Sequence, residues 1–193
     1  MLSGLILAGG RSERMGCDKA RLVLPDGRTL LQRQADILRE AGINNVLVSV
    51  AFGSDCKLPG ATLVADTRPD AGPLAGIAAG LRAATEGLVL VLAVDMPDIR
   101  AEHLQHLVNL STGSCGVVPV RGGHCEPLVA VYPAALAASA EADLATGQRA
   151  VHQWVRREAG RGRLRLWEAP AEWADVLRSW NTAADLPPPT EPM

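Results

Sequence analysis

The sequence predicts a single α/β domain with a mostly parallel central sheet. Short apolar runs alternate with helical segments through the first half of the chain, an order typical of right-handed βαβ units. The apolar run Leu88–Val94 has no polar face, as a central parallel strand covered by helices on both sides requires. The 193 residues fit one domain, which we assign to residues 1–186. We expect residues 187–193, with the sequence PPPTEPM, to form a disordered tail.

The expected elements follow from the local pattern of apolar residues. Strands are predicted where short apolar runs end at turn residues: 5–8, 46–50, 62–65, 88–94, 116–119, 127–132 and 163–167. Helices are predicted where the apolar spacing is helical or the segment is rich in alanine: 30–41, 73–84, 101–110, 134–158 and 173–180. Gly42 is a suitable residue to end the first helix, and Pro73 fits the first turn of the second.

Composition excludes several classes of protein. Hydrophobic residues make up 48% and charged residues 21% of the chain, enough apolar surface for a folded core. The net charge of −2 argues against a general nucleic-acid binder, and no apolar run approaches the ~20 residues that span a bilayer. The first six residues lack the basic start of a signal peptide. We therefore expect a cytoplasmic protein with reduced cysteines that binds neither nucleic acid nor membrane.

Polar or glycine-rich residues directly follow three of the predicted strands. Gly9-Gly10-Arg11-Ser12 follows the first strand, Asp66 the third and Asp95 the fourth. Ligands of an open parallel sheet bind beyond the carboxyl ends of its strands. The convergence of these three features predicts a ligand site at that edge of the sheet.

The loop 7–19 has the composition of a phosphate-binding segment. Its glycines would let backbone N–H groups approach a phosphate, and Arg11, Arg14 and Lys19 could contact a polyphosphate. The loop is neither a P-loop nor a G-x-G-x-x-G motif. A solvated glycine turn is the alternative, but three basic residues within nine positions favour the functional interpretation.

Two aspartates, one glycine and one glutamate are further candidates. Asp66 and Asp95 are each either a helix cap or a ligand for Mg²⁺ or ribose, and Asp95, which closes the longest apolar run, favours the metal. Gly72 opens a helix whose free N–H groups could receive a ligand. Glu126 is either a contact for a second substrate or a plain loop carboxylate.

Residues 7–19, LAGGRSERMGCDK, resemble the signature loop of sugar-nucleotide and cofactor nucleotidyltransferases. The fuller pattern resembles the molybdenum cofactor guanylyltransferases: it adds GPLAGI at 72–77, DMP at 95–97, EPL at 126–128 with Tyr132, and Asn-Thr at 181–182. The resemblance implies a three-layer Rossmann-like fold. It also implies transfer of GMP from GTP to molybdopterin with release of pyrophosphate, the N-terminal part binding the nucleotide and the C-terminal part the pterin.

Site residues follow from the resemblance position by position. It implies nucleotide contacts from Leu7, Ala8, Gly9, Gly10, Lys19, Ser49, Asp66 and Asp95, catalytic roles for Lys19, Asp95 and Arg14, Mg²⁺ on Asp95, and molybdopterin contacts from Gly72, Glu126 and Asn181. Two positions depart from the family pattern. Ser49 stands where relatives often carry Asn, and Ala183 replaces the Pro of the usual Asn-Thr-Pro.

The choice of base leaves alternatives open. The resemblance implies GTP, because guanine-using members of the family tend to carry Gly-Gly after Leu-Ala, as here at 9–10, and cytosine-using relatives tend to carry Ala-Gly. The absence of a Cβ at Gly9 would leave room for the larger purine, which favours a guanylyltransferase over a cytidylyltransferase. The third hypothesis is a non-catalytic nucleotide-binding protein that delivers the cofactor. Implied partners are molybdoenzyme-specific chaperones or apo-molybdoenzymes, and we expect a monomer.

The remaining conspicuous residues have plainer interpretations. Five arginines within residues 156–165 are typical of a solvated face, although they could instead steer an anionic pterin phosphate or a partner. The four tryptophans are interpreted as packing anchors, and Gly76 and Gly80 as sites of close packing between helix and sheet.

Overall fold

The computed structural model describes residues 1–8, 19–51, 56–65 and 71–180. Five predicted site residues lie outside these ranges, namely Gly9, Gly10, Arg14, Asp66 and Asn181. The expected tail 187–193 also lies outside them.

Within the described ranges, eight strands form one sheet in the order β3-β2-β1-β4-β7-β5-β6, with β8 paired to β5. Its parallel core consists of β1 (Leu2–Leu7), β2 (Asn45–Val50), β3 (Thr62–Ala65) and β4 (Leu88–Ala93). The second half is β5 (Gly116–Arg121), β6 (His124–Cys125), β7 (Val129–Pro133) and β8 (Leu164–Glu168). Only β8 runs parallel to its neighbour there. The predicted mostly parallel sheet is confirmed for the core.

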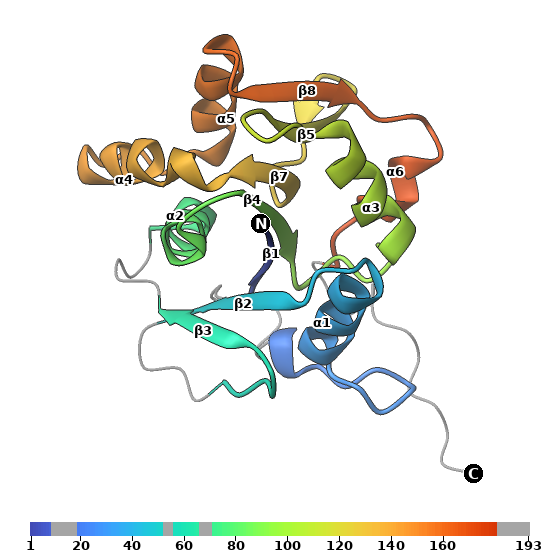
Figure 1. Ribbon diagram of the computed structural model, residues 1–193. Helices are drawn as coiled ribbons and strands as arrows, with labels where there is room; N and C mark the ends of the chain where they lie inside the picture. Colours follow the sequence, from blue (N-terminus) through green and yellow to red (C-terminus); the bar gives the residue numbers. More distant parts are fainter. Residues whose placement is uncertain (9–18, 52–55, 66–70, 181–193) are drawn as a thin grey trace.

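Helices cover both faces of the sheet and give three layers (Figure 1). One face carries α2 (Pro73–Ala84), α4 (Ala137–Ala145) and α5 (Val151–Gly160), and the other carries α1 (Leu30–Glu40), α3 (Ala101–Leu110) and α6 (Trp173–Val176). The short 3-10 helices are η1 (Lys19–Arg21) and η2 (Ala134–Leu136). None of the helices in the described part of the chain is long and apolar enough to cross a membrane.

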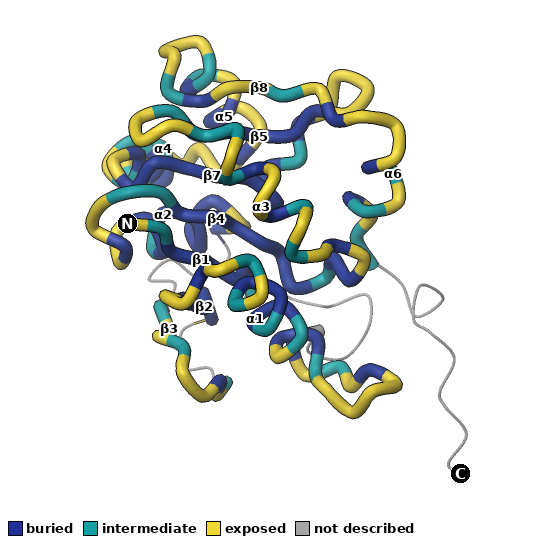
Figure 2. The backbone as a smooth tube through the Cα atoms, turned by 45° about the vertical axis from the view of Figure 1, so that its right-hand side comes forward, coloured by how far each residue is buried: buried dark blue, intermediate teal, exposed yellow. Residues whose placement is uncertain are grey.

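The central strands are buried on both faces because each face packs on its own helical layer. In β1, Leu5 and Leu7 belong to the core shared with α2, whereas Ile6 belongs to the core shared with α1. Figure 2 shows β1 and β4 running through the buried interior. This arrangement explains why the strand sequences are continuously apolar rather than alternating.

The α1 helix begins where the sequence predicts because Thr29 caps it. The Thr29 hydroxyl accepts a hydrogen bond from the Gln32 backbone N–H at 3.1 Å, and Gln32 Oε1 accepts one from the Thr29 backbone N–H at 2.8 Å. This reciprocal capping box satisfies two N–H groups at the helix start.

Two helix predictions are wrong in extent. The segment expected to be helical over 134–158 is divided into η2, α4 and α5, with a break around Gly147, whose φ of +81° ends α4. The last helix ends at Val176 instead of 180. The two-residue strand β6 was not predicted, because so short a segment carries no periodicity.

The arginine-rich stretch is only partly a solvated face. Arg156 and Arg165 are exposed, as predicted. Arg157, Arg161 and Arg163 instead form ion pairs with the buried carboxylate of Glu158. Arg157 precedes Glu158 on α5, and Arg161 and Arg163 lie on the turn between α5 and β8, so all three reach one acceptor.

Candidate active site

The carboxyl ends of the central strands meet at Leu7. In the sheet register, Leu7 lies beside Ser49 of β2 and beside Ala93 of β4. The Ala8 N–H donates to the Ser49 carbonyl at 3.0 Å, and the Val94 N–H donates to the Leu7 carbonyl at 3.2 Å. Strand order reverses between β1 and β4, which is the switch point where open α/β sheets bind ligands.

Asp95 lies two residues beyond the end of β4 at this edge and is half-buried. Its carbonyl oxygen accepts a hydrogen bond from the Trp180 N–H at 2.8 Å, so the C-terminal segment reaches the same place. The carbonyls on either side of it accept from the side chain of Gln34 on α1. The backbone of this turn is thus held by two elements distant in sequence.

The loop between β6 and β7 lies against the end of β4. The Leu128 carbonyl accepts from the Ala93 N–H at 2.8 Å, and the Tyr132 hydroxyl donates to the Pro127 carbonyl at 2.8 Å. Glu126 of this loop is half-buried, and burial raises the pKa of its carboxyl group while the charges of Arg121 and two histidines oppose the rise. A carboxyl group with a raised pKa therefore lies on the loop that adjoins β4.

Ser49 is buried against α2. A Cβ built on Gly76 would lie 2.7 Å from Ser49 Oγ and 3.0 Å from Leu7 Cδ2. The Ser49 side chain thus occupies the layer between β2 and α2, and its predicted nucleotide contact stays a prediction. A Cβ built on Gly80 would lie 2.6 Å from Leu5 Cδ1. The interpretation of both glycines as sites of close packing is therefore confirmed.

Gly72 is the N-cap residue of α2 and has a φ of +74°, which favours glycine. No side chain caps this helix start within the described residues, and Pro73 carries no N–H. The Ala75 N–H already donates to the Gly72 carbonyl at 3.1 Å, so the Leu74 N–H is the group of the first turn that a ligand could use. The molybdopterin contact predicted for Gly72 stays a prediction.

Lys19 begins η1, at the far end of the predicted loop 7–19. The roles of Gly9, Gly10, Arg14, Asp66 and Asn181 stay predictions, since these residues lie outside the described ranges.

The donor set at the strand ends suits a metal that arrives with its substrate. The described part of the chain contains no group of three histidine, cysteine, aspartate or glutamate side chains that could hold a metal by themselves. Mg²⁺ is usually held by one or two carboxylates together with substrate phosphates. Asp95, beside the switch point, is compatible with that mode of binding.

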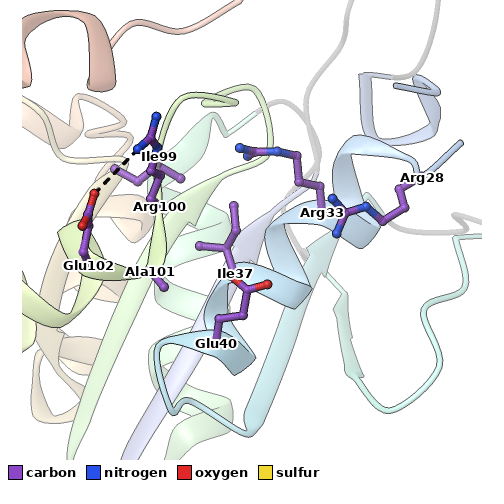
Figure 3. Close-up of a pocket in the computed structure, with 8 residues that line it drawn as sticks. All are labelled: Arg28, Arg33, Ile37, Glu40, Ile99, Arg100, Ala101 and Glu102. Carbon is purple, nitrogen blue, oxygen red and sulfur yellow. Dashed lines mark ion pairs between the residues drawn. The ribbon is translucent and has the colours of Figure 1, made fainter. Parts of the chain in front are cut away.

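A cavity of about 550 Å³ lies between α1 and the start of α3 (Figure 3). Its lining mixes charges, with Arg100 3.9 Å from Glu102, while Arg28 pairs with two aspartates. The Nη1 of Arg33 is buried and has no hydrogen-bond acceptor in the described part of the chain, and burial lowers the pKa of Arg33. The mixed lining is less suited to a triphosphate than the strand ends are.

Sequence reasoning missed Gln34 and Trp180. A signal existed for Gln34, because it interrupts the apolar stripe of the helix four residues from both Leu30 and Leu38. No local signal marks the backbone of Trp180, whose partner lies in another element.

Comparison with known proteins assigns the family. Residues 4–162 match the MobA-like NTP transferase domain. The chain belongs to the MobA-like NTP transferase family. It is 38% identical to the "Probable molybdenum cofactor guanylyltransferase" of Opitutus terrae, over 95% of this chain and 92% of the relative. It is 34% identical to the molybdenum cofactor guanylyltransferase of Pseudomonas putida, over 82% and 84% of the two chains.

Solved structures agree with this fold. The molybdopterin-guanine dinucleotide biosynthesis protein A of Archaeoglobus fulgidus has a TM-score of 0.72 at 22% identity, over 96% of this chain and 94% of the other. A nucleotidyl transferase from Methanothermobacter has a TM-score of 0.75 at 21% identity, over 96% and 94%. The expected nucleotidyltransferase fold is therefore confirmed, and this MobA-like chain is a nucleotidyltransferase.

Proposed function

We propose that this protein transfers GMP from GTP to molybdopterin. A phosphate oxygen of molybdopterin forms a bond to the α-phosphorus of GTP, the bond between that phosphorus and the oxygen bridging to the β-phosphate breaks, and pyrophosphate leaves. The product is molybdopterin guanine dinucleotide. The observation that carries the proposal is the meeting of Leu7, Ala8 and Asp95 at the β1–β4 switch point, in a chain whose relatives are named guanylyltransferases.

The chemistry asks the protein to position charges more than to move protons. The attacking phosphate is already an anion, so no general base is required. The difficulty is to align two polyanions, and the backbone N–H groups of the loop after β1 together with Lys19 and Arg14 would bind the triphosphate, while backbone atoms of Leu7, Ala8 and Gly9 would line the guanine. When bound, Mg²⁺ supplies neutralisation of the charge that develops on the leaving pyrophosphate. In this proposal Asp95 holds the metal, and Asp66 and Ser49 complete the nucleotide site.

The acceptor side of the proposed site uses the second half of the chain. The Glu126 loop adjoins β4, and Gly72 opens α2 without a side-chain cap. These features support molybdopterin contacts by Glu126 and Gly72, to which we add Asn181 from the resemblance. The protein would then act as a monomer in the cytoplasm and pass its product to an apo-molybdoenzyme or its chaperone.

Substitution of Asp95 tests the assignment. With GTP, molybdopterin and Mg²⁺, Asp95→Ala should abolish pyrophosphate release, whereas Asp98→Asn, on the exposed part of the same turn, should leave it unchanged. Lys19→Ala should cost about 2–4 kcal/mol of transition-state stabilisation, as expected for the loss of one preorganised charge. Near-normal guanylyl transfer by Asp95→Ala would refute the proposed site.

The same assay separates the alternatives. A cytidylyltransferase would release pyrophosphate with CTP faster than with GTP. A delivery protein would bind the nucleotide and release no pyrophosphate. Gly9 favours the purine, since a Cβ at that position would crowd the base.

A further inference from the structure

The side chain of Gln34 crosses from α1 to the turn after β4. It has no exposed surface, and its Nε2 donates to the carbonyl oxygen of Met96 at 2.8 Å and to that of Val94 at 3.3 Å. Only the NH₂ group of an amide can donate to two carbonyl oxygens, so these partners fix the orientation of the amide. Gln34 therefore bonds to the peptide group directly before Asp95 and to the second peptide group after it.

The carbonyl of Asp95 itself is bonded elsewhere. It accepts a hydrogen bond from the Trp180 N–H at 2.8 Å. The N–H of Val94, the residue before Asp95, donates to the Leu7 carbonyl. Three consecutive carbonyls, from 94 to 96, are thus held by α1 and the C-terminal segment. Because the peptide planes on either side of Asp95 are fixed, the direction in which its Cβ leaves the backbone is fixed too.

The other half of the Gln34 amide makes no hydrogen bond within the described residues. Its Oε1 is buried and has no hydrogen-bond donor within the residues that the structure describes. An unpaired buried acceptor is destabilising, so an apolar side chain of the same length would remove one penalty but would leave the Val94 and Met96 carbonyls without this donor. These two effects oppose each other, so the stability of such a variant is measured beside its activity.

We propose that Gln34 is a positioning residue that orients Asp95 toward the metal-bound nucleotide. The inference rests on the proposed function, in which Asp95 holds Mg²⁺. Gln34 lies inside the protein and touches no substrate; it acts through the backbone of residues 94–96. Loss of the Gln34 amide keeps the Asp95 side chain but allows the turn that carries it to rotate, so the direction of the carboxylate changes.

Gln34→Met tests this role, because methionine has a similar length and no donor. We expect kcat to fall about 10- to 100-fold, as for small misplacements of a catalytic group, while the KM for GTP changes by less than about 2-fold. The Mg²⁺ concentration for half-maximal rate should rise several-fold. As a readout independent of turnover, Mn²⁺ binding to the complex with a non-hydrolysable GTP analogue, followed by electron paramagnetic resonance, should weaken several-fold.

Ser3→Ala is the matched control. Ser3 is also fully buried and accepts a hydrogen bond from Asn45 at 2.8 Å, but it lies near the amino end of β1, away from Asp95. A general loss of packing would affect both variants alike, whereas positioning predicts altered metal dependence in Gln34→Met only.

The outcomes separate the two proposals. A wild-type protein that forms no guanine dinucleotide overturns the proposed function. An active wild type together with a Gln34→Met variant of unchanged kcat and metal affinity overturns the role of Gln34 alone. If the methionine variant does not fold, Gln34→Leu replaces it. If neither Gln34 variant folds while Ser3→Ala does, Gln34 is required for folding, and the positioning role is overturned.

Discussion

Arg163 forms an ion pair with Glu158, a carboxylate that has no exposed surface. Two more arginines approach the other carboxylate oxygen, Arg161 at 3.2 Å and Arg157 at 3.6 Å, and the Ser139 hydroxyl donates to it at 2.6 Å. The buried carboxylate thus ties α4 and α5 to the start of β8.

Replacing this carboxylate should destabilise the protein. Glu158→Gln leaves three guanidinium groups without their common counter-charge, and because the arginines are partly exposed we expect a loss of about 1–3 kcal/mol in the free energy of unfolding. Urea denaturation measures the change. Arg156→Gln, at an exposed arginine of the same stretch, is the control and should stay within about 0.5 kcal/mol of wild type. Equal stability of the two variants would contradict the network.

A methyl group at Gly80 should be poorly tolerated. Its Cβ would lie 2.6 Å from Leu5 Cδ1 and 2.8 Å from Leu5 Cγ, inside a core where neither β1 nor α2 can retreat. We expect Gly80→Ala to lower the free energy of unfolding by about 1–3 kcal/mol. Gly160→Ala in α5, where a Cβ meets open space, should instead be neutral or stabilising by up to about 1 kcal/mol. Thermal unfolding of both variants measures the two changes. A Gly80→Ala variant as stable as wild type would show that α2 can move away from β1.

Protonation of His103 should weaken the fold in mild acid. Burial lowers the pKa of His103, and its Nδ1 accepts the Arg100 N–H at 3.1 Å, which requires the neutral ring. Because the folded pKa lies below 6.5, the stability contributed by the neutral ring is present above pH 6.5 and is lost as the pH falls through the folded pKa.

His103→Gln removes this titration but keeps an acceptor for the helix start. The variant loses a ring contact with Trp173, at 5.0 Å between centroids, so we expect lower stability at neutral pH. The difference from wild type should shrink as the pH falls below 6.5. Denaturation curves at several pH values measure it, and parallel pH profiles would rule the effect out.

Glu126 should show the opposite pH dependence. Burial raises the pKa of its carboxyl group, so the neutral form suits the folded state better. Its contribution to stability is therefore greatest below the ordinary glutamate pKa of 4.5 and is lost as the pH rises through the folded pKa. Glu126→Gln should become more stable relative to wild type between pH 4 and pH 7. The same denaturation series tests this, and a difference independent of pH would contradict the raised pKa.

Local sequence was sufficient where an element carries its own periodicity and end signals. The helices at 73–84 and 101–110 and the strand at 62–65 have the predicted bounds, because apolar spacing and flanking turn residues define them. The helix 134–158 was predicted too long, since alanines support a helix on either side of Gly147 and do not show where it breaks.

The sequence by itself determined which residues follow the ends of the central strands. It placed the segment 9–12, Asp66 and Asp95 at one edge of the sheet, and Asp95, the one of these within the described residues, lies at that edge. Only the tertiary structure decided what holds Asp95: an amide from Gln34, about sixty residues earlier, and the N–H of Trp180. The physical reason is that apolar periodicity is a local property of the chain. The partner of a buried hydrogen-bonding group depends instead on which distant segments the packed layers bring together.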